Sequence, residues 1–289
     1  MSWIREGELN LLERFSANVL KAGPMPKHVA FIMDGNRRFA RKKNMECLKG
    51  HMQGFNKLAE TLRWCKHLNI QEVTVYAFSI ENFKRTKEEV DGLMELARQK
   101  FVKLLEERCF LNVCFSYTSR YEITNAVREM AWGVEEGLLK ASDVSESLLN
   151  ECLYSNNSPN PDLLIRTSGE VRLSDFLLWQ SSHSCIVFQS VLWPEYSFWN
   201  LCEAILRYQL NYKSIQKARD LHREQQTLMQ LESDCACVAD LLQNHGNGKP
   251  VDAQRRQEAL QHYISCREER IQDFLQALKH KRDSYFSDL

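Results

Sequence analysis

Five short apolar runs, rich in β-branched and aromatic residues, constrain the fold more than any other feature of this sequence. They lie at residues 28–33, 73–78, 110–117, 163–165 and 186–188. Helix-forming stretches such as residues 55–68 separate most of these runs. Strands that alternate with helices along a chain usually form a parallel sheet covered by helices. The sequence therefore predicts an α/β domain with a largely parallel sheet flanked by helices.

Both ends of the chain lack strand signals. Residues 1–22 place apolar side chains near helical spacing, and this segment is predicted to be a helix that packs on the domain or lies on a membrane surface. From residue 201 onward the residues are charged helix formers, interrupted by glycine and proline at 245–250. We therefore expect an N-terminal helix over 1–22, a main domain over 23–200 and a C-terminal helical hairpin over 201–289.

Composition narrows the classes of function. Lysine plus arginine and aspartate plus glutamate both total 38, so no net charge attracts the chain to nucleic acid. The ten cysteines include no C-x-x-C pair and the N-terminus has no secretory leader pattern, which favours a reducing, cytosol-facing compartment. No apolar run approaches the roughly 20 residues of a membrane span. Any membrane contact is expected from the surface.

The first candidate site begins where the run at 28–33 ends. Ligands of open α/β sheets bind outside the carboxyl ends of the strands, so Asp34 lies where a substrate is expected. A carboxylate there can hold Mg²⁺, which usually keeps substrate phosphates among its ligands. Gly35 lets the backbone come close, the amide of Asn36 follows, and Arg37 and Arg38 open a helix that favours phosphate. The alternative is a capping aspartate with solvated arginines.

Two further polar clusters follow apolar runs. One, at 78–85, contains Asn82 and Arg85, and the other contains Arg166, Arg172 and Ser174. Guanidinium groups bind phosphate oxygens as bidentate forks, so the second cluster suits another diphosphate. Together the clusters predict two diphosphate-bearing substrates that face each other beside one carboxylate. Phosphate-loop, dinucleotide-binding and nucleophile-elbow motifs are missing, and a phosphohydrolase would want a second aspartate where Asn36 stands.

These clusters resemble the signature motifs of the cis-prenyltransferases, the undecaprenyl diphosphate synthase-like family. The similar stretches cover most of residues 25–200 and are 34–40, 50–54, 78–85, 166–180 and 192–194. The resemblance implies that 23–200 is a catalytic domain with an apolar tunnel between sheet and helices. It also implies Mg²⁺-dependent condensation of isopentenyl diphosphate with an allylic, farnesyl-type diphosphate. The product would be a long-chain polyprenyl diphosphate for dolichol synthesis and protein glycosylation.

The resemblance also implies roles for individual residues. Asp34 would position the magnesium ion, and Asn82 would assist the proton loss that closes each cycle. His51 would help at the allylic diphosphate or serve as a structural helix histidine. The residues implied to bind the allylic diphosphate are Gly35, Arg37, Arg38 and Arg85, and those implied to bind isopentenyl diphosphate are Arg166, Arg172 and Ser174. Asn36 is also expected to bind substrate.

The sequence departs from the family pattern at three places. A strand and a helix of the family are missing near residue 108, and Cys47 stands where the family usually has a phosphate-binding arginine. Cys185 stands where single-subunit members have a glutamate, and the chain ends without the Arg-x-Gly motif that completes the site. The resemblance therefore implies a partner subunit like the Nogo-B receptor, which would tether the enzyme to the cytosolic face of the endoplasmic reticulum membrane. The rival hypothesis is a catalytically impaired variant that only binds this partner.

Overall fold

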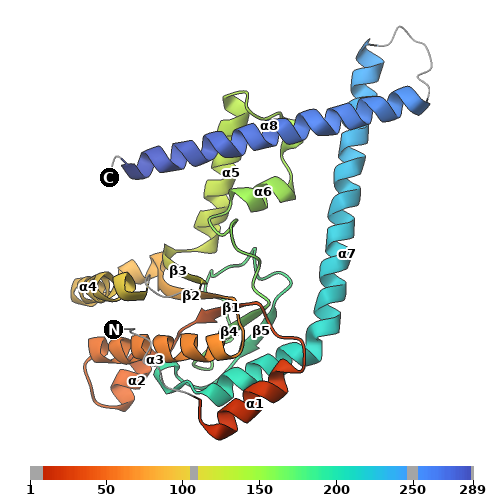
Figure 1. Cartoon of the computed structure of the whole chain (residues 1–289). Helices are drawn as coiled ribbons and strands as arrows, with labels where there is room; N and C mark the ends of the chain where they lie inside the picture. Colours follow the sequence, from red (N-terminus) through yellow and green to blue (C-terminus); the bar gives the residue numbers. More distant parts are fainter. Residues whose placement is uncertain (1–8, 105–109, 246–252, 288–289) are drawn as a thin grey trace. The chain divides into compact units, whose positions relative to one another are not determined.

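The computed structural model describes residues 9–104, 110–245 and 253–287 of the chain (Figure 1). It divides into two compact units, which are described separately. The first comprises Met1–Arg120 and Pro159–Lys217, and the second comprises Tyr121–Ser158 and Ala218–Leu289. The second boundary therefore falls inside one long helix, α7 (Phe198–His245). The boundaries drawn from the sequence at residues 22 and 200 stay predictions.

The first unit is built on a five-stranded sheet in the order β3-β2-β1-β4-β5. All four strand pairs are parallel, which confirms the predicted α/β class. Within the described residues, β3 has a partner on one side only, so it is an edge strand. The chain reaches it from α4 through residues 105–109, outside the described residues. The strands are β1 (His28–Ile32), β2 (Glu72–Ser79), β3 (Phe110–Tyr117), β4 (Leu163–Arg166) and β5 (Cys185–Phe188).

Both faces of the central strand β1 are buried, as expected of a parallel sheet covered on each side. Val29 and Phe31 join a large core to which α3 and the start of α7 contribute. Ala30 and Ile32 point the other way, into a smaller cluster with Phe176. The other helical elements of this unit are α1 (Leu11–Lys21), α2 (Asn36–Lys42), α3 (Cys47–His67), α4 (Lys87–Leu104) and the 3-10 turns η1 (Ile80–Lys84) and η3 (Trp193–Glu195).

The predicted N-terminal helix is present as α1, and residues 1–8 lie outside the described residues. Asn10 caps it, because its side-chain oxygen accepts a hydrogen bond from the backbone N–H of Glu13 at 2.8 Å. Glu13 returns the contact by accepting from the backbone N–H of Asn10 at 3.0 Å. Ala17 and Leu20 are buried against the domain. Other apolar side chains of the helix are exposed, so α1 is amphipathic with an uncovered apolar face.

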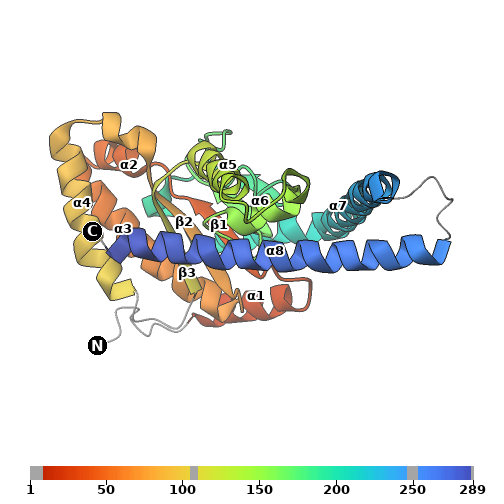
Figure 2. The ribbon, with the colours of Figure 1, turned by 90° about the horizontal axis from the view of Figure 1, so that it is seen from above.

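The second unit contains α5 (Ser119–Glu135), η2 (Ala141–Asp143), α6 (Glu146–Cys152), the later part of α7, and α8 (Ala253–Ser287), and Figure 2 shows α8 running past α5 and α6. Phe274 of α8 packs tightly on α5, since a Cβ atom added to Gly133 would lie 2.5 Å from its ring. Both helices of the predicted hairpin exist, and most of its predicted turn lies outside the described residues. No helix among the described residues is long and apolar enough to cross a membrane.

Candidate active site

A cleft of about 790 Å³ opens in the first unit at the carboxyl ends of β1, β2 and β4. Parallel strands end on the same edge of a sheet, so the polar stretches that follow them converge there. The cleft is lined by all of the site residues predicted from the sequence, which are Asp34, Gly35, Asn36, Arg37, Arg38, His51, Asn82, Arg85, Arg166, Arg172 and Ser174. The structure thus brings the three predicted clusters together, while the role of each residue stays a prediction.

Asp34 follows β1 and lines this cleft. One carboxylate oxygen accepts a hydrogen bond from Arg166 Nη2 at 2.9 Å and the other from the Gly35 N–H at 2.6 Å. Burial alone would raise the pKa of Asp34, but hydrogen bonds from Arg166 and Ser168, the charge of Arg166 and the Gly35 N–H lower it below its usual value. Asp34 is therefore an ionised carboxylate at neutral pH.

Gly35 is required by both conformation and space. Its φ of +106° lies in the left-handed region, which residues other than glycine rarely adopt. A Cβ atom there would lie 2.9 Å from the side chain of Leu192. The chain can therefore turn directly from Asp34 into α2, which begins at Asn36. Gly54 of α3 leaves room for the Asn36 side chain in the same way, since a Cβ atom would overlap the Asn36 amide oxygen.

Arg166 organises the opposite wall of the cleft. Its side chain is 4% exposed, and its Nη1 donates to the Arg172 carbonyl at 2.5 Å and to Ser174 Oγ at 2.6 Å. Ser174 and Asp175 have positive φ values of 50° and 61°, and such conformations cost energy outside glycine. The buried guanidinium therefore holds a strained loop at the cleft, with the Arg172 side chain 67% exposed beside Glu170.

The arginines of the cleft outnumber the acids that they contact. Arg37 and Arg85 share Glu89, with nitrogen–oxygen distances of 3.7 and 2.9 Å. Arg38 lies 3.6 Å from the Asp34 carboxylate that Arg166 already contacts. It also donates to the Ser168 carbonyl at 2.9 Å and to the Ser168 hydroxyl. A concave surface with surplus cations concentrates anions, and guanidinium forks match phosphate oxygens.

Asn82 lines the cleft from η1. Its side-chain oxygen accepts a hydrogen bond from the Ser79 N–H at 3.0 Å, and Ser79 Oγ accepts from the Glu81 N–H at 3.2 Å. These bonds fix the turn that follows β2. An amide oxygen has two lone pairs, so Asn82 keeps one for a substrate or a water molecule.

His51 extends from α3 to the edge of the cleft. Burial and the charge of Arg85 lower the pKa of His51 to about 4, although Glu89 opposes the shift. The imidazole is therefore neutral at physiological pH. Its Nε2 is buried and makes no hydrogen bond to the part of the chain that the structure describes. This placement leaves both predicted roles of His51 open.

An apolar pocket of about 80 Å³ continues from the cleft between the sheet, α3 and α4. Its lining includes Phe55, Leu58, Phe78, Leu96 and Phe115. The pocket lies where the tunnel is predicted, but it is smaller than the 300–1,000 Å³ of typical ligand pockets. A tunnel that holds a long product therefore stays a prediction.

Three residues of the site were missed by sequence reasoning. Glu89 forms ion pairs with Arg37 and Arg85. Thr167 Oγ1 donates a hydrogen bond to the Asp34 carbonyl at 2.8 Å. Ser168 accepts hydrogen bonds from Arg38. Glu89 stands four residues after Arg85 in a helical stretch, a spacing that signals an ion pair. Thr167 and Ser168 lie inside the family-like stretch 166–180, but no periodicity of the sequence distinguishes them from their neighbours.

The donor set around Asp34 fits a magnesium ion. The carboxylate is ionised, one third exposed and directed into the cleft. Mg²⁺ is usually bound through one or two carboxylates together with substrate phosphates and water. A single aspartate beside an anion-binding cleft meets that requirement.

The fold and cleft define a class, an α/β enzyme that binds diphosphates at the carboxyl edge of a parallel sheet. A prenyltransferase family described as putative undecaprenyl diphosphate synthase matches residues 32–109 and 103–216. The human dehydrodolichyl diphosphate synthase complex subunit is 60% identical over 328 aligned positions, covering 100% of this chain and 98% of that protein. The chain therefore belongs to the cis-prenyltransferase family of undecaprenyl diphosphate synthases.

More distant proteins agree with this assignment. A tritrans,polycis-undecaprenyl-diphosphate synthase of Pyrococcus furiosus is 41% identical over 225 positions, covering 65% of this chain and 85% of the relative. The crystal structure of lavandulyl diphosphate synthase from Lavandula x intermedia in complex with dimethylallyl diphosphate superposes with a TM-score of 0.59 at 28% identity. The superposed region covers 64% of this chain and 95% of the lavandulyl diphosphate synthase chain. The resemblance that the motifs indicated is confirmed.

The family match is broken at one place. Its two segments meet at residues 103–109, and the alignment with the human protein runs over 328 positions although this chain has 289 residues. The relative thus contains residues with no counterpart here. The break falls where the sequence analysis places the missing strand and helix, and the identity of the missing elements stays a prediction.

Proposed function

We propose that this chain condenses isopentenyl diphosphate onto an allylic, farnesyl-type diphosphate and extends it to a long-chain polyprenyl diphosphate for dolichol synthesis and protein glycosylation. The observation that carries the proposal is that arginines on both walls of one cleft outnumber the acids that they contact, with two of them at the carboxylate of Asp34. Two anion-binding walls suit two diphosphates, and the apolar pocket suits a prenyl tail.

The allylic diphosphate binds on the α2 side of the cleft. Gly35 and Asn36 admit it close to the backbone, and Arg37, Arg38 and Arg85 bind its oxygens. Arg37 and Arg85 exchange their contact with Glu89 for the diphosphate. As the bond between the allylic carbon and oxygen breaks, the diphosphate leaves with the electron pair, and fixed guanidinium groups stabilise the charge that develops.

Isopentenyl diphosphate binds on the β4 side. Arg166 is already fixed by its contacts, Ser174 offers a hydroxyl, and the exposed Arg172 can exchange its contact with Glu170 for the second diphosphate. The double bond of this substrate attacks the allylic carbon and forms the new carbon–carbon bond. The carbon next to the resulting cation then loses a proton to the departed diphosphate, which restores a double bond, and Asn82 assists this proton loss.

Asp34 would hold the magnesium ion. When bound, Mg²⁺ supplies positive charge that neutralises the leaving diphosphate. The contact with Arg166 keeps Asp34 ionised and aimed into the cleft, so the carboxylate is ready before a substrate arrives. His51 stays neutral beside the allylic side and adds no charge that competes with the arginines there.

We further propose that the chain works with a Nogo-B receptor-like subunit at the cytosolic face of the endoplasmic reticulum membrane, without nucleic acid. The human relative is a subunit of a dehydrodolichyl diphosphate synthase complex, which supports a partner for this chain. The uncovered face of α1 supports peripheral membrane contact, because apolar side chains of an amphipathic helix can enter the interface. That face consists of Leu11, Leu12, Phe15 and Val19, which are 86%, 62%, 66% and 58% exposed.

The test is incorporation of labelled isopentenyl diphosphate into butanol-soluble product by the chain co-expressed with its partner, with magnesium and farnesyl diphosphate. The wild-type chain should form long products, and Asp34→Ala should form none. Asp220→Ala, which removes an exposed aspartate of α7, is the matched control and should retain activity. A soluble, partner-bound wild-type chain that makes no product would favour the impaired variant that only binds the partner.

A further inference from the structure

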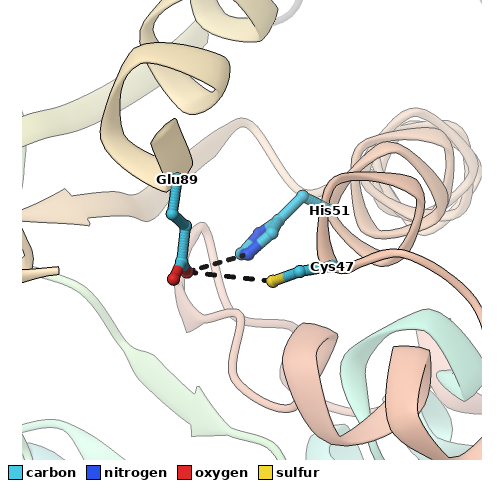
Figure 3. A group of neighbouring side chains, drawn as sticks. All are labelled: Cys47, His51 and Glu89. Carbon is cyan, nitrogen blue, oxygen red and sulfur yellow. Dashed lines mark hydrogen bonds and ion pairs between the residues drawn. The ribbon is translucent and has the colours of Figure 1, made fainter. Parts of the chain in front are cut away.

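Three side chains of the types that bind soft metal ions meet between α3 and α4. Cys47 and His51 stand one turn apart on α3, and Glu89 reaches them from the first turn of α4 (Figure 3). The Glu89 carboxylate oxygen lies 3.8 Å from the Cys47 sulfur and 3.8 Å from His51 Nε2. Their ligand atoms all lie within 4.8 Å of one another.

These separations are close to those around tetrahedral zinc. With zinc–ligand distances near 2.0–2.3 Å, neighbouring sulfur, nitrogen and oxygen ligands are about 3.4–3.6 Å apart. The two contacts to Glu89 are therefore only a few tenths of an ångström too long. Binding of one ion would require the three ligand atoms, which now lie within 4.8 Å of one another, to move slightly closer together.

The chemistry of each side chain suits ligation. His51 Nε2 is buried and has no hydrogen-bond partner within the described segments, so its lone pair is available without breaking a contact. Arg37 and Arg85 lie near Cys47 and favour its thiolate, although burial and Glu89 raise the pKa of the thiol overall. Metal binding displaces the thiol proton.

Two positive charges oppose a cation at this place. Arg85 donates to Glu89 at 2.9 Å, and Arg37 lies 3.7 Å from the same oxygen. Glu89 has a second carboxylate oxygen, and thiolate and carboxylate together bring two negative charges to the ion. The arginines lower the affinity of the site but leave its ligands in place.

We propose that Cys47, His51 and Glu89 form a binding site for a single Zn²⁺ ion, with a fourth position open to water. Imidazole and thiolate ligands select zinc over the hard Mg²⁺ ion, so this site is chemically distinct from Asp34. The proposed binding of zinc does not depend on whether the chain catalyses prenyl transfer. It would draw Glu89 away from Arg37 and Arg85 at the edge of the cleft.

Cobalt replacement tests the proposal on the full chain with its partner. Co²⁺ should give a thiolate-to-metal charge-transfer band and tetrahedral d–d bands at one equivalent per chain, and Zn²⁺ should abolish both. Cys47→Ser, His51→Ala and the nearly isosteric Glu89→Gln should each weaken zinc binding, the first two by more than about 100-fold, since even lost outer-shell partners cost 10–100-fold. Circular dichroism establishes that each variant is folded.

Cys266→Ser is the matched control. Cys266 lies 3.7 Å from a ring nitrogen of His262 on α8. This is another cysteine–histidine pair one turn apart, but no third metal-ligating side chain joins it among the described residues. This variant should keep both the spectrum and the affinity of the wild type. Absence of saturable zinc binding, or loss of the cobalt bands in Cys266→Ser with retention in folded Cys47→Ser, would overturn the assignment.

Discussion

Arginines are prominent in both units, but they are used differently. In the second unit three acids with little exposure each have a guanidinium of their own, Asp234 from Arg267, Asp143 from Arg270 and Glu129 from Arg282. The shortest nitrogen–oxygen distance in each of these pairs is 2.7 Å or less. In the cleft, by contrast, two arginines share Glu89 and two share Asp34.

The difference separates structural from functional charge. In a buried one-to-one ion pair each charge is neutralised by the other, and the role of the pair is to hold helices in place. A shared acid leaves part of each guanidinium unsatisfied, so an arriving anion finds donors already positioned. The surplus, rather than the number of arginines, is the reason for proposing the cleft as the binding site.

The largest expected effect is a loss of unfolding free energy when a buried ion pair of the second unit is broken. Arg270→Ala leaves Asp143, whose side chain is fully buried, without its bidentate partner. Breaking a buried pair in this way typically costs about 3–5 kcal/mol of unfolding free energy. Chemical denaturation should show this loss, while calorimetry should show unchanged diphosphate affinity in the folded variant. A parallel loss of affinity would break the division between the two uses of arginine.

Arg166→Lys should produce the opposite pattern. Lysine keeps the charge but cannot contact Asp34, Ser174 and the Arg172 carbonyl together as the guanidinium does. We expect kcat/KM for isopentenyl diphosphate to fall by about 10²–10³-fold, the usual cost of a misplaced electrostatic donor. Arg270→Lys is the matched exchange in the second unit. Comparable kinetic losses in the two variants would contradict the account.

His51 makes the cleft sensitive to acid. Its pKa is about 4 in the folded chain against 6.5 when unperturbed, so the unfolded chain binds the proton more readily. Its contribution to stability is complete above pH 6.5 and is lost as the pH falls through about 4, by up to about 3 kcal/mol. Denaturation of zinc-free protein at several pH values should give a shallower loss for His51→Gln. Identical slopes for variant and wild type would rule out the assigned burial effect.

The smallest contrast compares two serines. Ser174→Ala removes an acceptor for Arg166 and should raise KM for isopentenyl diphosphate roughly five- to tenfold, equivalent to about 1 kcal/mol. Ser145→Ala removes the N-cap of α6, where Oγ accepts from the Leu148 N–H, and should cost about 1 kcal/mol of stability. Steady-state kinetics and thermal unfolding on both variants separate the effects. An unchanged KM for Ser174→Ala would remove the serine from the site.

Much of the fold and cleft could be predicted because the decisive signals are local. Each strand appeared as an apolar run, and parallel strands bring their carboxyl ends to one edge, so Asp34, Asn82 and Arg166 were expected to converge. Contacts between remote segments could not be foreseen. The Trp193 N–H donates to the Asp34 carbonyl at 2.9 Å, and the Trp193 indole donates to the Gly54 carbonyl at 2.7 Å.

The contact of two arginines with the same acid could also not be predicted from the sequence. It depends on α2, η1 and α4 placing Arg37 and Arg85 on the same side of Glu89, and only the Arg85–Glu89 spacing was visible. The compact units were hidden for a similar reason. Residues 121–158 belong with the helices of the hairpin, which tertiary packing decides rather than composition.

The measurement that tests the central claim most directly is a calorimetric titration of the partner-bound chain, first with an unreactive thio analogue of farnesyl diphosphate and magnesium, then with isopentenyl diphosphate. Our account predicts one equivalent of each per chain, weakening of the second by Arg166→Lys, and no effect of Arg270→Lys. Binding of fewer than two diphosphates, or equal effects of the two exchanges, would contradict the assignment of the surplus arginines to two substrates.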